Sequence, residues 1–171
     1  MSKVKYATIM EGFGGPRMCH RHEVDLVQSA MAPSDARTIV RRMCSEMHVE
    51  DLTDTAALLT SELVTNAVRH GSGPLHLDIA CTRGHLVVSV FDSDPAPPKP
   101  RRAHPREPGG RGLSLVESLS EHWGFRQLPD DGKAVWFTLR PNTPPVQDAC
   151  DCHTEQFDSE VPSIPVSRTG I

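Results

Sequence analysis

The sequence predicts an α+β fold: a two-layer sandwich in which a mainly antiparallel or mixed sheet carries its helices on one face. Three observations support this prediction. Residues 34–70 contain two stretches with apolar residues at helical spacing, residues 75–91 contain two stretches of alternating apolar residues, and two more strand-like stretches follow a short helix near residue 115. Strands joined by tight turns pair antiparallel, and amphipathic helices bury their apolar stripes against such a sheet.

The N-terminal half supplies one strand and two helices. Residues 1–22 show no sustained period and are expected to form a flexible arm, and residues 23–30 are expected to form a strand. Ser34 can cap the first helix, and Asp51 opens the second, which runs to about residue 70 before two glycines. The apolar positions of the first helix are Ala36, Ile39, Val40, Met43 and Met47.

The C-terminal half predicts four strands and one helix. The first two strands flank a turn at Gly84, and six prolines in residues 94–108 then exclude a helix or central strand there. After Pro141 the chain is polar and without period, so residues 142–171 are expected to be a disordered tail and residues 23–141 one domain. The expected strands are 75–81, 85–91, 123–128 and 133–140, and the expected helix is 113–122.

Composition limits the classes of protein to which this chain can belong. A length of 171 residues suits one globular domain with tails, and a net charge of −4 argues against a nucleic-acid partner, which normally requires a basic surface. No apolar stretch is long enough to cross a bilayer and the N-terminus lacks a signal-peptide core, so a cytoplasmic protein without a membrane partner is expected. The five cysteines predict free thiols, because their number is odd and the chain shows no export signal. The paired spacing of a structural zinc site is absent, so no zinc site is expected.

The second predicted helix places two polar residues beside its apolar stripe. At about 100° per residue, Asn66 lies about 20° from Leu59 on the helical wheel and Glu62 about 60° from it, whereas His70 falls within the apolar arc. A buried amide or carboxylate needs a polar partner. The helix alone does not distinguish a structural partner, such as a neighbouring loop, from a ligand.

Two further patterns suit a nucleotide. The sequence GGRG, ending in Gly110, Arg111 and Gly112 before Leu113, opens a helix, and exposed backbone N–H groups at a helix start suit phosphate. It matches neither the P-loop nor the dinucleotide-binding pattern, so alone it could equally be a flexible helix cap. An apolar strand ends at Asp92 and Asp94, and an acid at a strand end can accept a hydrogen bond from an exocyclic amine. Asp is also a common turn residue, so these acids could instead belong to a turn before Pro95.

The order and approximate spacing of these motifs resemble a known ATP-binding fold. An E-x-x-x-N helix, an acid at a strand end, a long loop and G-x-G at a helix start are similar to the fold shared by gyrase, chaperone, histidine-kinase and mismatch-repair ATPases. ELVTNAVRHG, GGRGLSLVESL, WGF and KAVWF most resemble the bacterial anti-sigma-factor serine/threonine kinases, over roughly residues 23–140. The resemblance implies an ATP-dependent protein kinase that phosphorylates an anti-anti-sigma partner of the STAS type and sequesters a sigma factor.

The resemblance also implies a role for each matching residue. Glu62 would be the general base that takes a proton from the attacking hydroxyl, and Asn66 would hold Mg²⁺ against the phosphates. Asp92 would accept from the adenine amine, His70 would contact ATP, and residues 94–108 would form a lid over the nucleotide. The phosphate cradle would consist of Gly110, Arg111, Gly112 and Leu113, with Arg111 adding charge.

Two departures from the family pattern affect the expected adenine site. The family motif Asp-x-Gly-x-Gly is replaced by DSDPA at residues 92–96, and Ala134 stands where a threonine often occurs, which removes a hydroxyl that could support adenine. Nucleotide affinity is therefore expected to be on the order of micromolar to millimolar. An ATP-gated binding module without phosphotransfer is the alternative to a kinase. The resemblance also implies a homodimer through the first strand and the first helix.

Overall fold

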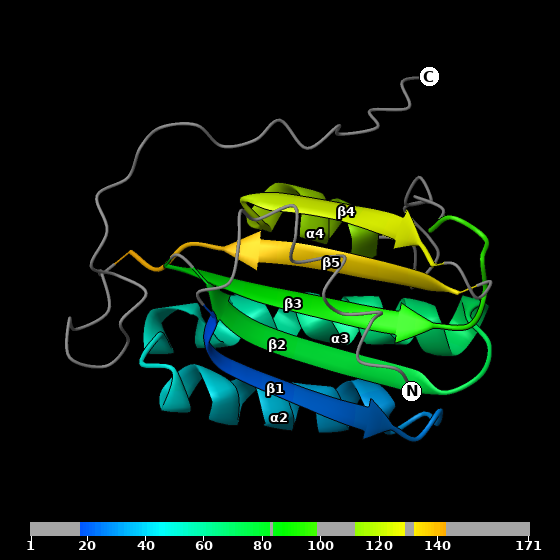
Figure 1. Ribbon diagram of the computed structural model, residues 1–171, viewed down its shortest axis with the longest axis horizontal. Coiled ribbons are helices and arrows are strands. Elements are labelled where there is room, and N and C mark those ends of the chain that lie inside the picture. The colour runs from blue at the N-terminus through cyan, green and yellow to red at the C-terminus, as the bar shows by residue number, and fades with distance from the viewer. Residues whose placement is uncertain (1–17, 83, 99–111, 129–131, 143–171) are drawn as a thin grey trace, which may run out of the picture.

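The described residues of the computed structural model form one antiparallel sheet with its helices on one face, which confirms the predicted fold class (Figure 1). The structure describes residues 18–82, 84–98, 112–128 and 132–142. Five strands lie in the order β1-β2-β3-β5-β4, and every neighbouring pair is antiparallel. The elements are β1 (Met18–Leu26), α2 (Ala32–Glu46), the 3₁₀ turn η2 (Glu50–Leu52), α3 (Thr53–His70), β2 (Leu75–Thr82), β3 (His85–Asp92), α4 (Gly112–Leu119), β4 (His122–Gln127) and β5 (Lys133–Leu139).

Apolar side chains from the sheet and the helices form the core between the two layers. The expected turn between β2 and β3 contains Gly84 at a φ of 75°, a conformation that glycine adopts without strain. Because side chains alternate along each strand, one set points towards the helices. Five of these residues are at most 1 % exposed: Leu77, Ile79, Val88, Val90 and Phe137. Burying side chains of this size stabilises the fold by about 1.5–3 kcal/mol each and holds α3 against the sheet.

Helix α2 begins two residues before the expected cap. Its N-cap is Met31 and no side chain caps it, so the prediction that Ser34 caps this helix is wrong. Pro33 fits in the first turn, because the N–H that proline lacks would have no helical partner there. The predicted period is nevertheless observed, and the buried residues of the helix are Ala32, Ala36, Val40, Met43 and Cys44.

Strand β1 lies earlier in the chain than expected. It spans Met18–Leu26, and its register with β2 places Leu26 opposite Leu75. Residues 18–22 therefore belong to the sheet and not to an arm, and residues 27–30 lie beyond the strand end. Pairing with β2 satisfies the backbone N–H and C=O groups of this edge strand that face β2, although the side chains of residues 18–22 carry no apolar alternation that would predict a strand.

The remaining expected helices and strands are found within a few residues of their predicted bounds, and other expected segments fall outside the described residues. Helix α3 ends at His70 as predicted, whereas α4 ends at Leu119 because His122 already belongs to β4. The rest of the expected arm, most of the expected lid and the expected tail lie in residues 1–17, 99–111 and 143–171, which the structure does not describe.

The end of α3 and the end of β3 meet at Gly71. A Cβ at this position would lie 2.5 Å from Ala67 O and 2.8 Å from Asp92 Cγ, so only glycine allows the approach. Ser93 N also donates to Ser72 O at 2.7 Å, which ties the two segments together. This junction brings the last turns of α3 beside Asp92.

Candidate functional site

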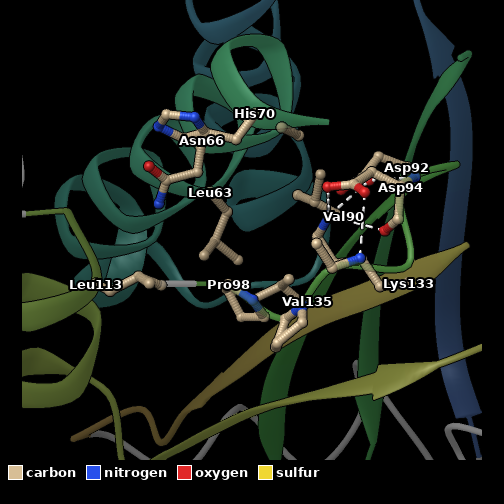
Figure 2. A pocket seen from close by; sticks show the side chains of 13 residues that line it. Leu63, Asn66, His70, Val90, Asp92, Asp94, Pro98, Leu113, Lys133 and Val135 are labelled. Carbon is tan, nitrogen blue, oxygen red and sulfur yellow. Dashed lines mark hydrogen bonds and ion pairs between the residues drawn. The ribbon is translucent and has the colours of Figure 1, made fainter. Parts of the chain in front are cut away.

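A cavity of about 260 Å³ lies between α3, the start of α4 and the adjoining ends of β3 and β5 (Figure 2). Its walls combine apolar side chains with a few polar ones, which is the usual composition of a small-molecule site. Four residues that the sequence singled out line it: Asn66, His70, Asp92 and Leu113. The other lining residues are Leu63, Ala67, Val90, Asp94, Ala96, Pro97, Pro98, Lys133 and Val135.

The apolar part of the cavity suits a flat ring. Leu63 of α3, Val90 of β3 and Val135 of β5 are 2 %, 1 % and 7 % exposed, and Figure 2 shows all three side chains around the same space. The two valines share the helix-covered face of neighbouring strands, where they lie opposite each other in the register. A planar ligand placed there would gain about 25 cal/mol for each Å² of apolar surface it buries.

Asp92 is a buried acceptor at one end of the cavity. It is 4 % exposed, and its Oδ1 accepts hydrogen bonds from Lys133 Nζ at 2.8 Å and from Asp94 N at 2.9 Å. A buried carboxylate is costly unless it is paired, and the Lys133 ammonium supplies the opposite charge. Among the described residues no hydrogen bond uses Asp92 Oδ2, so this oxygen can accept from a ligand's amino group.

Lys133 is a site residue that the sequence analysis missed. It begins β5, is 5 % exposed, and its Nζ also donates to Asp94 O at 2.9 Å and to Asp94 Oδ2 at 3.2 Å (Figure 2). One signal was present in the sequence: in a strand, a residue two positions before the apolar Val135 lies on the same face as Val135. Only the folded chain shows that two carboxylates stand beside the lysine and make its burial tolerable.

Ala134 does not face the cavity, so the expectation that a hydroxyl at this position would support adenine is wrong. Ala134 is fully buried in a separate cluster with Phe91, Trp136 and Leu128. Side chains alternate along a strand, and it is the neighbours of Ala134 in sequence that line the cavity. The missing threonine hydroxyl therefore leaves the cavity wall unchanged.

The start of α4 forms the other end of the site. Gly112 lies so close to α3 that a Cβ there would come within 2.6 Å of Glu62 Oε2 and 3.6 Å of Asn66 Nδ2. Backbone N–H groups at a helix start attract anions, and an amide oxygen suits Mg²⁺. In Figure 2, Asn66 and Leu113 lie on the side of the cavity opposite Asp92 and Lys133. The site thus has one end suited to an amino group and one end suited to phosphate.

The predicted site residues fall into three groups. Asn66, Asp92, Leu113 and the exposed His70 line the cavity, and Glu62 and Gly112 adjoin it at the α3–α4 contact; Asn66 and Glu62 are half-buried. Gly110 and Arg111 lie outside the described residues.

Comparison with known protein families identifies the fold family. The family model of the histidine kinase-like ATPase domain matches residues 29–139 of this chain, which is well over half of its length. The chain belongs to this family. Membership implies ATP binding, usually with Mg²⁺, and an ATP-dependent activity. No curated protein sequence matches the chain.

The side chains of this ATPase domain fit Mg²⁺-ATP. Asp92 offers an acceptor to the base amino group, the apolar walls fit the ring, and Asn66 offers an amide oxygen beside the start of α4. In the described part of the chain, no group of three or more His, Cys, Asp or Glu side chains could hold a metal ion. A Mg²⁺ ion would therefore be held by Asn66 together with phosphate oxygens and water. No helix in the same residues is long and apolar enough to cross a membrane.

Proposed function

We propose that the protein is a serine/threonine protein kinase that uses ATP to phosphorylate an anti-anti-sigma partner and that acts as an anti-sigma factor. The observation that carries this proposal is the position of Glu62, whose carboxylate lies beside Gly112 and one helical turn from Asn66. ATP binding alone needs no carboxylate there, because a negative charge repels phosphate. A general base must stand near the phosphates in order to take the proton of an attacking hydroxyl.

Each side chain has a distinct role in the proposed reaction. Asp92 orients the nucleotide by accepting from its base, and Asn66 holds Mg²⁺, which would neutralise charge on the phosphates. Glu62 accepts the proton of a serine or threonine hydroxyl on the partner as that oxygen bonds to the γ-phosphorus. The bond from the γ-phosphorus to the β–γ bridging oxygen breaks, and ADP leaves with that oxygen.

Two substitutions on α3 test the proposal. Glu62→Gln keeps the size and polarity of the side chain but removes the base, so ATP binding is expected to persist while phosphotransfer falls about 10²–10⁴-fold. Asn66→Ala removes the Mg²⁺ ligand, so binding and transfer are expected to fail together. Isothermal titration with Mg²⁺-ATP measures binding, and radiolabelled ATP with candidate STAS domains measures transfer. A Glu62→Gln variant that transfers phosphate as fast as wild type would show that Glu62 is not the base.

A non-catalytic, ATP-gated module that sequesters a sigma factor is the second candidate function. The observation that favours it is the glycine-free segment after Asp92, which the fold holds in place. Lys133 Nζ donates to Asp94 O at 2.9 Å, and Gln127 Nε2 donates to Pro95 O at 3.1 Å. A wall held in this way can bind a nucleotide without any phosphotransfer step. A wild-type protein that binds ATP but phosphorylates no candidate partner would replace the kinase with this module.

The proposed partners are a STAS-type protein, a sigma factor and a second copy of the chain, all in the cytoplasm, where sigma factors act. For the second copy, the supporting observation lies in the segment between β1 and α2, residues 27–31. Its Val27 and Met31 are 80 % and 62 % exposed. Large exposed apolar side chains favour a protein interface. The segment that carries them joins β1 to α2, the two elements through which the family resemblance implies a homodimer.

A further inference from the structure

Lys133 is a buried cation whose three hydrogen-bond donors are all used by acceptors at one end of the cavity. An ammonium group has three donors. Three acceptors lie near Nζ: Asp92 Oδ1 at 2.8 Å, Asp94 O at 2.9 Å and Asp94 Oδ2 at 3.2 Å. The side chains of Lys133 and Asp92 are 7 % and 2 % exposed, so water does not compete for these contacts. Lys133 therefore has no donor left for a ligand.

The same contacts fix the orientation of the Asp92 carboxylate. Its Oδ1 accepts from both Lys133 Nζ and Asp94 N, so rotation of the carboxylate would break two hydrogen bonds at once. Gly71 packs against the carboxylate from the side of α3, as its close approach to Asp92 Cγ shows. This end of the cavity thus offers a ligand one anchored acceptor oxygen and no cationic donor.

We propose that Lys133 is a positioning residue that makes the cavity select 6-amino purines over 6-oxo purines. The inference rests on the proposed function, in which the cavity holds the purine base of a nucleotide. A 6-amino group donates to Asp92, whereas a 6-oxo group in the same place directs its lone pairs at the carboxylate. Lys133 cannot turn to meet the 6-oxo group, because all three of its donors are engaged. Without the ammonium, the Asp92 carboxylate keeps, within the described part of the chain, only the hydrogen bond from Asp94 N and can turn its free oxygen away from the 6-position of the base. A 6-amino group then loses its acceptor and a 6-oxo group meets less repulsion, so the preference for 6-amino purines narrows.

A merely structural role of Lys133 predicts a different result. Lys133 also holds Asp94 and, through it, the wall formed by Ala96, Pro97 and Pro98. If this wall were all that mattered, loss of the lysine would weaken the binding of every purine nucleotide equally. Gln127 provides the matched control, because its bond to Pro95 O ties the same segment without touching Asp92.

The test compares ATP with inosine triphosphate, which differs at the 6-position of the base. Isothermal titration of each nucleotide with Mg²⁺ gives the ratio of the two dissociation constants for wild type, Lys133→Met and Gln127→Leu. We expect wild type to prefer ATP and Lys133→Met to narrow that preference about tenfold or more, which is the scale of one hydrogen bond to a charged group. Gln127→Leu is expected to weaken both nucleotides and leave the ratio unchanged.

Lys133→Met could unfold the protein, because it leaves the Asp92 and Asp94 carboxylates close together without a cation. A second variant therefore controls for unfolding. Lys133→Met/Asp94→Asn keeps the net charge of the cluster at that of wild type and is expected to fold and still lose the preference. An unchanged ratio in this variant, or a wild type that binds both nucleotides equally, overturns the inference alone. A wild type that binds neither nucleotide overturns the proposed function with it. A wild type that prefers ATP but transfers no phosphate overturns the kinase and leaves this inference standing.

Discussion

Substitution of Gly112 by alanine tests whether the contact between α3 and α4 sets the position of the proposed base. The added Cβ would lie 2.6 Å from Glu62 Oε2, and an ordinary contact begins at 3.4 Å, so the carboxylate oxygen must retreat by about 0.8 Å, the difference between the two. The neighbouring distance to Asn66 Nδ2, 3.6 Å, is already ordinary and requires no movement. A misplacement of about 1 Å can cost about 10²-fold in rate. We therefore expect phosphotransfer to fall about 10- to 100-fold while ATP affinity stays within about threefold.

The melting temperature distinguishes a loss of phosphotransfer caused by a displaced Glu62 from one caused by a folding defect. Alanine is favoured over glycine in a helix by about 0.5–1 kcal/mol. The larger movement is required of the end of a flexible, half-buried side chain, and Glu62 Cβ, at 3.3 Å from the added Cβ, is already within about 0.1 Å of an ordinary contact at 3.4 Å, so little change in melting temperature is expected. Gly124→Ala is the matched control, because its Cβ would lie 2.9 Å from Trp136 Cζ2, a rigid ring outside the cavity. It is expected to lower the melting temperature and to leave transfer per folded molecule unchanged. Wild-type transfer by a folded Gly112→Ala variant would refute the role of this contact in placing Glu62.

Three further predictions concern the rest of the domain. Burial raises the pKa of the Cys44 thiol to about 11, against 9.0 for an ordinary thiol, so the folded state keeps a proton that the unfolded chain loses above pH 9. The free energy of unfolding should therefore fall by about 2–3 kcal/mol between pH 9 and 11, as measured by urea titration. Cys44→Ala should reduce this dependence on pH. Arg21→Met should lower the free energy of unfolding by about 3–5 kcal/mol, because it leaves the Asp78 carboxylate buried and unpaired. Asp78→Asn should lower it by less, because the Arg21 side chain that loses this partner is more exposed. Burial raises the pKa of Asp78, so the loss in Arg21→Met should shrink as acid protonates this carboxyl. Met31→Glu should dissociate the proposed homodimer in sedimentation experiments without lowering the melting temperature of the monomer, and an unchanged mass would place the interface elsewhere.

Local patterns predicted most of the fold. The helical period before His70 and the glycine that follows it defined the end of α3, and the alternation on both sides of Gly84 defined β2 and β3. These signals are local because helices and hairpins repeat contacts between residues close in the chain. The predictions for β1 and for the start of α2 were less accurate, since strand pairing with β2 and a proline in the first turn override weak local preferences.

The sequence by itself determined which chemical groups the site contains and, in part, where they lie: Asn66 on the edge of an apolar helix face and Asp92 at the end of a buried strand. Only the tertiary structure showed that Lys133 neutralises Asp92 from 41 residues away and that Ala134 points out of the cavity. It alone placed Gly112 against Glu62. The physical reason is that spacing along the chain encodes which face of an element a side chain occupies, whereas pairing of charges and close backbone approach depend on which elements pack together.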